Sequence, residues 1–199
     1  MNQFSIQAAT TAEFIIGLYR QFGGNDYIGE PVSQIEHMCQ CAQLAEEEGY
    51  DDEIILAAFF HDIGHLCEHI MEVGHMGGFG VMNHEQLGAA FLRENGFSEK
   101  ISSLVGNHVE AKRYLTYRYP DYFDRLSPAS RKTLEFQGGR MTPEEAAAFE
   151  ADPYFVLHTR LRFWDDLAKR QNCPLPSLDR YQDMIVRHLN RAETDITPS

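Results

Sequence analysis

The pair His61-Asp62, followed by His65 in the run HDIGH, is the strongest chemical signal in this 199-residue sequence. The run lies inside EIILAAFFHDIGHLC, a stretch so apolar that we expect it to be buried on all sides. Polar groups there must be satisfied away from water, by hydrogen bonds within the core or by a metal ion. Imidazole and carboxylate together suit hard metals, and the two oxygens of Asp62 could bridge two ions. The dipeptide alone does not decide between a core pair and a metal site.

Further histidines and a second aspartate favour the metal site. His37 lies 24 residues before His61, and His108 lies 24 residues after His84. Each lies among apolar neighbours and is expected in the middle of a helix, while Asp165 lies in the aromatic run RFWDD. Any one of them alone is more typical of an ordinary core or surface residue. Four histidines and two aspartates on five helices are typical of a metal cage, whose candidate ligands are His37, His61, Asp62, His84, His108 and Asp165.

The basic residues are few and unevenly placed. The net charge is −13, and only Arg20 precedes Arg93 among the 17 lysines and arginines. This balance disfavours a nucleic-acid partner, because such proteins present a basic face to phosphate. A small anion can still be bound if a few cations converge on one pocket. Those cations would have to come from after residue 92.

Helical spacing selects the candidates for such an anion pocket. Lys112 follows His108 by four residues and Arg162 precedes Asp165 by three, so each shares a helical face with a candidate ligand. Such cations are usually solvated, but beside a metal they would suit a tetrahedral dianion. Ser130 and Thr133 share a face and could donate hydroxyls, and Gln137 is a further candidate. Their neighbours Arg131 and Lys132 are expected to face solvent.

Helix breakers and caps divide the chain into helical lengths, with no alternating strand pattern. We therefore predict an all-α fold, with residues 1–199 as one domain. The expected helices run from Thr10 to Gly23-Gly24, from Pro31 to Gly49, from Asp51 or Asp52 through Cys67, from about Met82 to Asn95, from Ser98 towards Tyr117, from Ser127-Pro128, from Thr142-Pro143, over 153–170 and over 177–191.

Other features of the sequence argue against a membrane span, a leader peptide, disulfide bonds and a phosphate-binding loop. No apolar run approaches the ~20 residues that cross a bilayer, and the first residues show no basic, then apolar, leader pattern. The four cysteines form no CxxC pair and are expected to be reduced thiols of a cytoplasmic protein. GHMGGFG lacks the lysine of a phosphate loop and is expected to be a turn that positions His84. The histidines without partner spacing are expected on the surface: His69, His75, His158 and His188.

The ordered residues His37, His61-Asp62 and Asp165 resemble the signature of the HD-domain superfamily, a helical bundle, over roughly residues 25–190. The added pair His84 and His108 resembles its two-metal branch. The narrower resemblance is to the phosphonate-cleaving HD-domain oxygenases, which belong with the mixed-valent di-iron oxygenases. It is carried by the runs DYIGE at 26–30, MGGFG at 76–80, KRYL at 112–115, SRKTLE at 130–135, QGG at 137–139 and WD at 164–165.

The resemblance implies two iron ions, Fe2+ and Fe3+. His37, His61, Asp62 and Asp165 would hold one, and Asp62, His84 and His108 the other. It also implies that Tyr27 covers an open iron position at rest and that Glu30 exchanges with it when substrate binds. From the residues alone these would be a packing tyrosine and a first-turn acid. For His65, a supporting hydrogen bond and a contact with substrate or O2 both remain open.

The implied reaction is O2-dependent cleavage of the carbon–phosphorus bond of a 1-hydroxyphosphonate. We favour a trimethylammonio group at C2, giving glycine betaine and phosphate, over an amino group, giving glycine. A cationic head could contact Tyr27, Glu30 and Phe79. The rival activity is metal-dependent hydrolysis of a phosphate ester, with a metal-activated water as nucleophile. The remaining alternative is an inactive HD module. The expected partners are therefore a small phosphonate and O2, with no nucleic acid and no membrane.

Overall fold

The computed structural model of the chain describes residues 3–27 and 29–194. These residues form eleven α-helices and one short 3-10 helix, η1, with no strand among them. The all-α prediction is therefore confirmed. The elements are α1 (Gln3–Phe22), α2 (Gln34–Glu47), α3 (Asp52–Phe60), η1 (Ile63–His69), α4 (His84–Glu94), α5 (Glu99–Gly106), α6 (His108–Arg118), α7 (Pro120–Arg125), α8 (Pro128–Phe136), α9 (Pro143–Glu150), α10 (Phe155–Leu167) and α11 (Leu178–Thr194).

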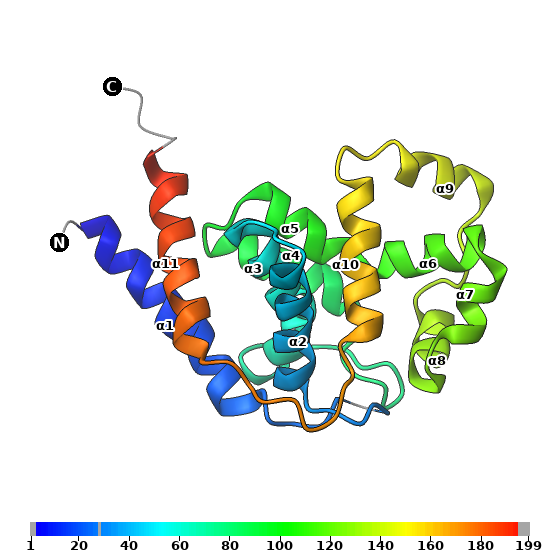
Figure 1. Cartoon of the computed structure of the whole chain (residues 1–199), viewed down its shortest axis with the longest axis horizontal. Helices are drawn as coiled ribbons and strands as arrows, with labels where there is room; N and C mark the ends of the chain where they lie inside the picture. Colours follow the sequence, from blue (N-terminus) through cyan, green and yellow to red (C-terminus); the bar gives the residue numbers. More distant parts are fainter. Residues whose placement is uncertain (1–2, 28, 195–199) are drawn as a thin grey trace.

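Helix α3 forms the centre of the core, as its composition predicts. Every residue from Ile54 to Phe60 is buried, and the helix contacts α2, α5, α10 and α11. The ring of Phe59 stacks between Tyr19 of α1 and Tyr181 of α11, with centroids 4.3 and 4.2 Å away. Figure 1 shows α1 and α11 paired on one side of this core and α6 to α9 on the other. The chain just after α3 is thus held in the middle of the molecule.

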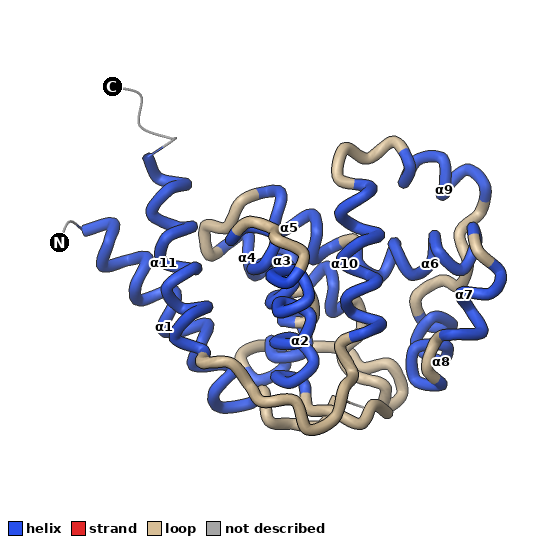
Figure 2. The backbone as a smooth tube through the Cα atoms, in the orientation of Figure 1, coloured by secondary structure: helices blue, strands red, loops and turns tan. Residues whose placement is uncertain are grey.

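The loops that matter for function lie along one edge. Figure 2 shows the segments 23–27 with 29–33, 70–83 and 168–177 gathered at the lower edge of the molecule, below the ends of α2 and α10. Two isolated bridges tie off the first two of these segments, Asp26 with Ser33 and His75 with Val81. Residues of all three segments line one cavity with Asp62 and His65, so the loops lie over the residues that follow α3.

Several helix ends agree with the positions predicted from the sequence, and two do not. Side-chain caps occur at Asp51, Ser98 and Thr142, as predicted. The capping box expected at Thr10 is wrong, because α1 runs through this position and the Thr10 hydroxyl donates to Ile6 O within the helix. The start expected at Pro31 is also wrong, because Ser33 caps α2 and forms a capping box with a residue three positions on.

Two helices predicted as continuous are broken. The length predicted from Asp51 through Cys67 ends as an α-helix at Phe60 and resumes as η1. The length predicted from Ser98 towards Tyr117 is divided at Asn107 into α5 and α6. Apolar periodicity continues across both breaks, so it could not reveal them. Both breaks occur beside candidate metal ligands.

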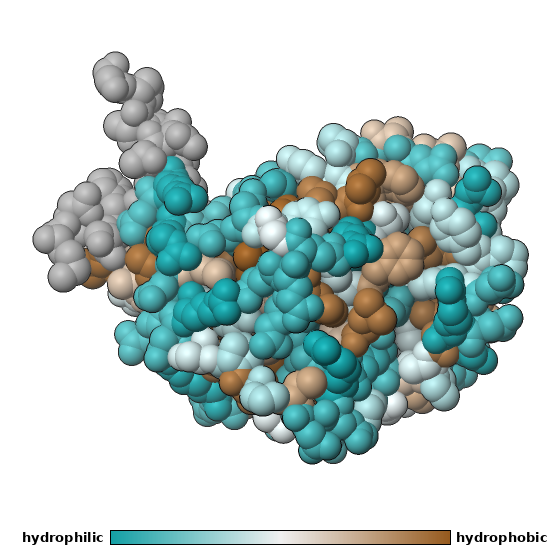
Figure 3. All heavy atoms as spheres, in the orientation of Figure 1, coloured by the Kyte–Doolittle hydropathy of each residue, from teal (hydrophilic) through white to brown (hydrophobic). Residues whose placement is uncertain are grey.

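The face of the molecule drawn in Figure 3 is largely hydrophilic. Apolar atoms gather over α10, where Val156 and Leu167 are 70% and 63% exposed. None of the helices described here combines the length and apolar character needed to cross a membrane.

Candidate metal centre and adjoining cavity

The six candidate ligands meet in the interior, each with 5% or less of its surface exposed. His37 lies within α2 and Asp165 near the end of α10. The mid-helix position expected for all four histidines is wrong for three of them. His61 terminates α3, and His84 and His108 are the first residues of α4 and α6.

Backbone carbonyls orient the rings of the first histidine pair. Nδ1 of His37 lies 2.9 Å from Ala168 O, and Nδ1 of His61 lies 2.8 Å from Ala58 O. A carbonyl only accepts, so Nδ1 carries the proton of each neutral ring and Nε2 presents a lone pair. Yet the two Nε2 atoms face each other at 2.9 Å. Two lone pairs repel at this distance unless both face a cation, so the arrangement fits a bound metal ion.

The second pair shares this arrangement in part, because Nδ1 of His84 is buried without a hydrogen-bond partner. Nδ1 of His108 lies 2.8 Å from Val105 O, and its Nε2 lies 3.1 Å from Nε2 of His84. In His61 and His108 alike, the carbonyl belongs to the residue three positions earlier, where the helix is breaking. The broken helix end therefore leaves a carbonyl that the imidazole takes up, and this directs Nε2 inward.

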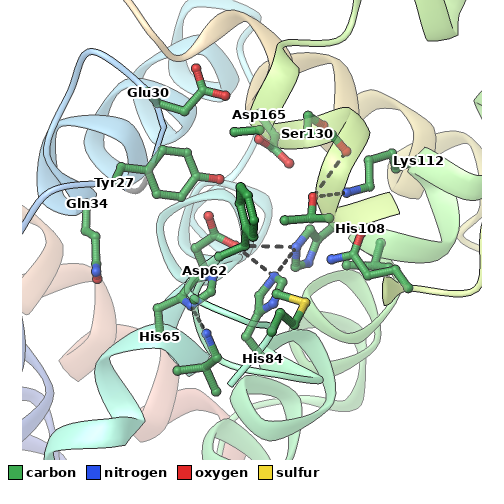
Figure 4. A pocket seen from close by; sticks show the side chains of 18 of the residues that line it. Tyr27, Glu30, Gln34, Asp62, His65, His84, His108, Lys112, Ser130 and Asp165 are labelled. Carbon is green, nitrogen blue, oxygen red and sulfur yellow. Dashed lines mark hydrogen bonds and ion pairs between the residues drawn. The ribbon is translucent and has the colours of Figure 1, made fainter. Parts of the chain in front are cut away.

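Asp62 lies between the two pairs. Its Oδ1 is 3.2 Å from His84 Nε2 and 3.4 Å from His108 Nε2, and its Oδ2 is 3.4 Å from Nε2 of both His37 and His61. Figure 4 shows the carboxylate reaching towards the second pair. Each oxygen thus faces a different pair, which is the geometry that a bridging carboxylate needs. The close groups that could hold an ion are accordingly His37, His61 and Asp62 on one side, and Asp62, His84 and His108 on the other.

The carboxylates of the centre are ionised and incompletely satisfied. Burial opposes the charge of Asp62, but positive charge at His61, which a bound cation would supply in place of a ring proton, outweighs it and holds the pKa of Asp62 well below its usual value. Asp165 is likewise buried, and the guanidinium of Arg162 holds its pKa well below the usual value. Oδ2 of Asp62 and Oδ1 of Asp165 nevertheless accept no hydrogen bond. Buried anionic oxygens without donors fit metal coordination.

A glycine allows the second histidine pair to lie close to Asp62. Gly64 of η1 lies against His84, and a Cβ at position 64 would come 1.9 Å from the His84 carbonyl oxygen. No side chain fits there without displacing the start of α4. The glycine of the HDIGH run therefore sets how closely His84 approaches Asp62.

His65 lies beside the ligands rather than among them. Its ring stacks on His84 with centroids 4.1 Å apart, and its Nδ1 accepts a hydrogen bond from Val81 N at 3.2 Å. Burial, aided by the neighbouring His84, lowers the pKa of His65 to about 3, so the ring is neutral. Its proton is then on Nε2, and the ring lines the cavity described next.

A cavity of about 330 Å³ adjoins the centre and is lined by Asp62, His84, His108 and Asp165. Lys112 and Arg162 also line it, and both are buried, with 3% and 4% exposed. Nζ of Lys112 donates to Thr133 Oγ1 at 3.0 Å (Figure 4). Burial, with the nearby charge of Arg162, lowers the pKa of Lys112 to about 7. The spacing argument thus placed both cations on the correct helical faces.

Arg162 is held more firmly than Lys112. Its Nη1 lies 2.6 Å from Asp165 Oδ2, its Nη2 pairs with Asp166, and its Nε donates to the Tyr122 hydroxyl at 3.1 Å. Nη2 also lies 3.4 Å from Ser130 Oγ. Arg162 therefore orients a candidate ligand as well as facing the cavity, a link that sequence spacing did not reveal.

The hydroxyls predicted to face the anion lie on the cavity side of α8. Ser130, Thr133 and Gln137 all line the cavity. Oε1 of Gln137 is buried without a hydrogen-bond partner, so it is free to bind a ligand. Arg131 points away, because its guanidinium bonds to the carbonyls of Leu126 and Asp124. The expected division of α8 into a cavity face and an outer face therefore agrees with the structure.

Tyr27 and Glu30 form the opposite wall. The ring of Tyr27 stacks on His37 with centroids 4.2 Å apart, and its hydroxyl points towards the space between Asp62 and Asp165 (Figure 4). Burial, together with the negative charges of those aspartates, raises the pKa of Tyr27 well above its usual value, so the phenol is protonated. Glu30 lies farther out.

Sequence reasoning missed Lys169, which also lines the cavity and whose Nζ donates to Glu30 Oε1 at 2.6 Å. The signal was present, since Lys169 follows Asp165 by four residues, the same spacing that selected Lys112. The surface position expected for His158 is wrong, because this ring is fully buried and packs beside Phe149. Its Nε2 lies 3.2 Å from Asp152 Oδ1, and its site is away from the metal centre.

Comparison with known proteins identifies the family. The model of the HD domain matches residues 35–154, well over half of the chain. The chain belongs to the HD-domain family. The sequence is also 39% identical over 187 residues to the 1-hydroxy-2-(trimethylamino)ethylphosphonate dioxygenase (glycine-betaine-forming) of Leisingera caerulea, covering 90% of each protein. It is 38% identical over 175 residues to the hydroxymethylphosphonate dioxygenase of Gimesia maris, covering 86% of each.

A third relative is an uncharacterized protein of Acanthamoeba polyphaga mimivirus, 47% identical over 182 residues, which cover 92% of this chain and 83% of that protein. Together these findings confirm the family predicted from the residues, and with it an oxygenase with a metal site.

Proposed function

We propose that this HD-domain protein is a di-iron oxygenase that cleaves the carbon–phosphorus bond of a 1-hydroxyphosphonate, giving a carboxylate and inorganic phosphate. The proposal rests on one observation, that a candidate metal centre and a group of anion-binding side chains line the same cavity. The His/Asp centre forms one wall, and Lys112, Arg162, Ser130 and Thr133 form another. A ligand that chelates a metal and carries a dianionic group would meet both. The names of two relatives point to the same chemistry.

Two irons suit the donor set. Neutral imidazoles and carboxylates bind iron and several other divalent metals, so the donors alone do not select it. The oxygenase relatives favour a metal that can exchange electrons with O2. His37, His61, Asp62 and Asp165 would hold one ion, and Asp62, His84 and His108 the other. When bound, the two irons would supply the activation of O2.

The protein residues would bind and orient the substrate. Lys112 and Arg162 would neutralise the outer phosphonate oxygens, and the Ser130 hydroxyl and the Gln137 NH2 group would donate hydrogen bonds to them. Thr133, whose hydroxyl donates to Ser130 O, would accept from Lys112 and hold its ammonium towards the substrate. By binding the phosphonate group, these buried cations would hold the C1 carbon next to the metal centre and keep water out of the space between them. His65, with its proton on Nε2, is placed to donate to an oxygen atom of the substrate or of O2.

The proposed reaction needs no other reductant. The 1-hydroxyphosphonate dianion and one O2 give a carboxylate, hydrogen phosphate and one proton, so atoms and charges balance. The carbon–phosphorus and C1–hydrogen bonds break, and C1 supplies all the electrons that reduce O2. Tyr27 covers the centre from the side of His37 and would have to move before a chelating substrate could bind.

Within this class we propose a trimethylammonio group at C2 in preference to an amino group. The cavity wall away from the anion clamp contains the rings of Tyr27 and Phe79 and the carboxylates of Glu30 and Glu68. Aromatic faces and carboxylates attract a quaternary ammonium. The relative from Leisingera caerulea is named for this substrate.

The test is O2 consumption with purified iron-loaded protein and each of three phosphonates: the trimethylammonio, amino and hydroxymethyl compounds. We expect one phosphate released per O2 consumed, and the highest kcat/KM for the trimethylammonio compound. Phosphate release that continues under argon would instead identify a hydrolase. A preference for the hydroxymethyl compound would reject the assignment of the head group but keep the reaction.

A further inference from the structure

Arg162, a member of the anion clamp, belongs to a closed ring of three side chains. Its Nε donates to the Tyr122 hydroxyl at 3.1 Å, and its Nη2 pairs with Oδ1 of Asp166. The Tyr122 hydroxyl in turn donates to Oδ2 of Asp166 at 2.5 Å. Every polar atom of the Tyr122 and Asp166 side chains is thus engaged. A rotation of the guanidinium would break its bonds to both partners.

The two partners of Arg162 lie behind it, away from the cavity. The described residues that line the cavity include Arg162 but neither Tyr122 of α7 nor Asp166 of α10. Tyr122 is 4% exposed, and the side chain of Asp166 is 22% exposed. A ligand in the cavity would therefore touch the guanidinium but not the two side chains behind it. Asp166 can act on such a ligand through the position of Arg162 and through its own charge.

Asp166 supplies a negative charge for which the proposed reaction has no use. Asp165, the other carboxylate paired with Arg162, would share its charge with a metal ion. Asp166 is then left as the counter-ion of the guanidinium. Its charge is also felt at the second cation of the clamp, because burial lowers the pKa of Lys112 to about 7 and the carboxylates of Asp165 and Asp166 oppose that shift. An anion in the cavity would meet two cations whose attraction Asp166 reduces.

A reduced attraction matters at the end of the proposed reaction. That reaction leaves inorganic phosphate in the cavity, with a charge and shape close to those of the phosphonate group of the substrate. Interactions that bind both equally tightly do not accelerate the chemical step. Tight binding of a ligand is mainly slow dissociation. Two buried cations without a counter-charge would therefore retain the product.

We propose that Asp166 is a positioning residue that, with Tyr122, fixes Arg162 towards Asp165 and lowers the affinity of the cavity for phosphate, so that the product can leave. The inference rests on the proposed function for the identity of the product. It predicts a definite sign, because removal of a residue bonded to an anion-binding arginine should strengthen anion binding. A merely structural role predicts the opposite, since a loosened Arg162 would bind anions less well.

Calorimetric titration of inorganic phosphate into the metal-loaded protein under argon measures this effect without turnover. Asp166→Asn removes the charge and keeps an acceptor for Arg162, so it should bind phosphate on the order of tenfold more tightly than wild type. Asp166→Ser also lacks the charge and should change the affinity in the same direction. Asp166→Glu keeps the charge and should bind phosphate as wild type does. Tyr122→Phe removes a hydroxyl but no charge, so its phosphate affinity should not rise.

Turnover of a 1-hydroxyphosphonate gives a second readout. In Asp166→Asn, KM and kcat should fall together, because substrate and product both bind more tightly and product release limits the rate. Asp179→Asn is the matched control, since Asp179 pairs with Arg20 at 2.6 Å and its side chain is 77% exposed. This control should change neither phosphate binding nor turnover. Metal content and circular dichroism of each variant separate a local change from a folding defect.

The outcomes for the ring and for the proposed function are distinct. Phosphate binding that is unchanged or weaker in folded Asp166→Asn and Asp166→Ser would overturn the proposal. Equal tightening in Tyr122→Phe would overturn it as well, because the charge would then not be the cause. Tighter phosphate binding in Asp166→Asn, in a protein that turns over no phosphonate, would reject the proposed function and retain the effect of Asp166 on anion affinity.

Discussion

Lys112 is a buried cation whose hydrogen bond goes to a hydroxyl, and its replacement should stabilise the protein while it weakens anion binding. The side chain is 3% exposed and donates to Thr133 at 3.0 Å. Burial is the main reason that the pKa of its ammonium is lowered from 10.5 to about 7, with the charge of Arg162 adding to it. The substrate-free cavity therefore holds a charge that water would stabilise better.

The size of this effect follows from the pKa. One pKa unit corresponds to ~1.4 kcal/mol, so the shift sets an upper limit of about 5 kcal/mol on the gain from removing the charge. Lys112→Met also removes the bond to Thr133, a loss of about 1 kcal/mol. The Thr133 hydroxyl keeps its donation to Ser130 O at 3.1 Å. We expect a net increase of roughly 2–4 kcal/mol in the free energy of unfolding, or about 5–10 °C in Tm.

The pH dependence has a definite sign. Below about pH 7, Lys112 is charged in both folded and unfolded chains, and the full penalty is present. Between pH 7 and 10.5 the folded group is neutral while the unfolded group is still charged, so the penalty declines as pH rises. The stability difference between Lys112→Met and wild type should therefore be largest near and below pH 7 and should vanish towards pH 10.5.

Urea unfolding of the metal-free proteins at several pH values measures the stability difference, with the exposed Lys132→Met as control. Phosphate binding to the metal-loaded proteins measures the second effect. Loss of one charged hydrogen bond should weaken binding by roughly 10- to 100-fold, with metal content unchanged. A Lys112→Met protein that is less stable than wild type at pH 6.5 and binds phosphate equally well would refute both the burial argument and the assigned role.

Three other variants test the centre itself. Asp62→Ala should lose both metals, because each oxygen faces one histidine pair; two full equivalents in metal analysis would exclude the bridge. Gly64→Ala should destabilise the fold by about 1–3 kcal/mol and release mainly the metal held by His84, which metal titration would detect as one weakened site. Arg162→Ala should lower both phosphate affinity and the occupancy of the metal that Asp165 would bind, so intact metal content with lost affinity would assign Arg162 to the substrate alone.

Residue type and spacing predicted much of this cavity. Helical spacing from His108 placed Lys112 correctly, and the same rule applied to Asp165 placed Arg162 correctly. Both results follow from the geometry of a helix, in which residues three or four apart share a face. Such reasoning cannot count how many partners a side chain has. It therefore missed that Arg162 is paired with Asp165 itself, and it overlooked Lys169 at the same spacing.

Other errors came from local chemistry that overrides a pattern. Thr10 with Glu13 has the spacing of a capping box, but apolar contacts with α11 carry α1 past it. His158 has no partner at ligand spacing, yet it is buried beside an aromatic ring and a carboxylate from a neighbouring turn. In each case the structure is decided by a contact that the sequence pattern does not include. For Thr10 it is packing against a distant helix, and for His158 it is a carboxylate on the adjacent turn. A single sequence does not display such contacts.

The broken helices connect these observations to the metal centre. A continuous α-helix through His61 would direct the carbonyl of Ala58 to the amide four residues on, and that carbonyl would not be available to hold the ring. The same applies to Val105 and His108. Because the helix stops, each carbonyl accepts from Nδ1 instead, and each Nε2 points to the centre as a lone pair. The helix breaks that hydrophobic periodicity could not predict are therefore what orients His61 and His108 as ligands. One break lies one residue before Asp62 and the other directly after α5, and these positions bring both histidine pairs to the Asp62 carboxylate.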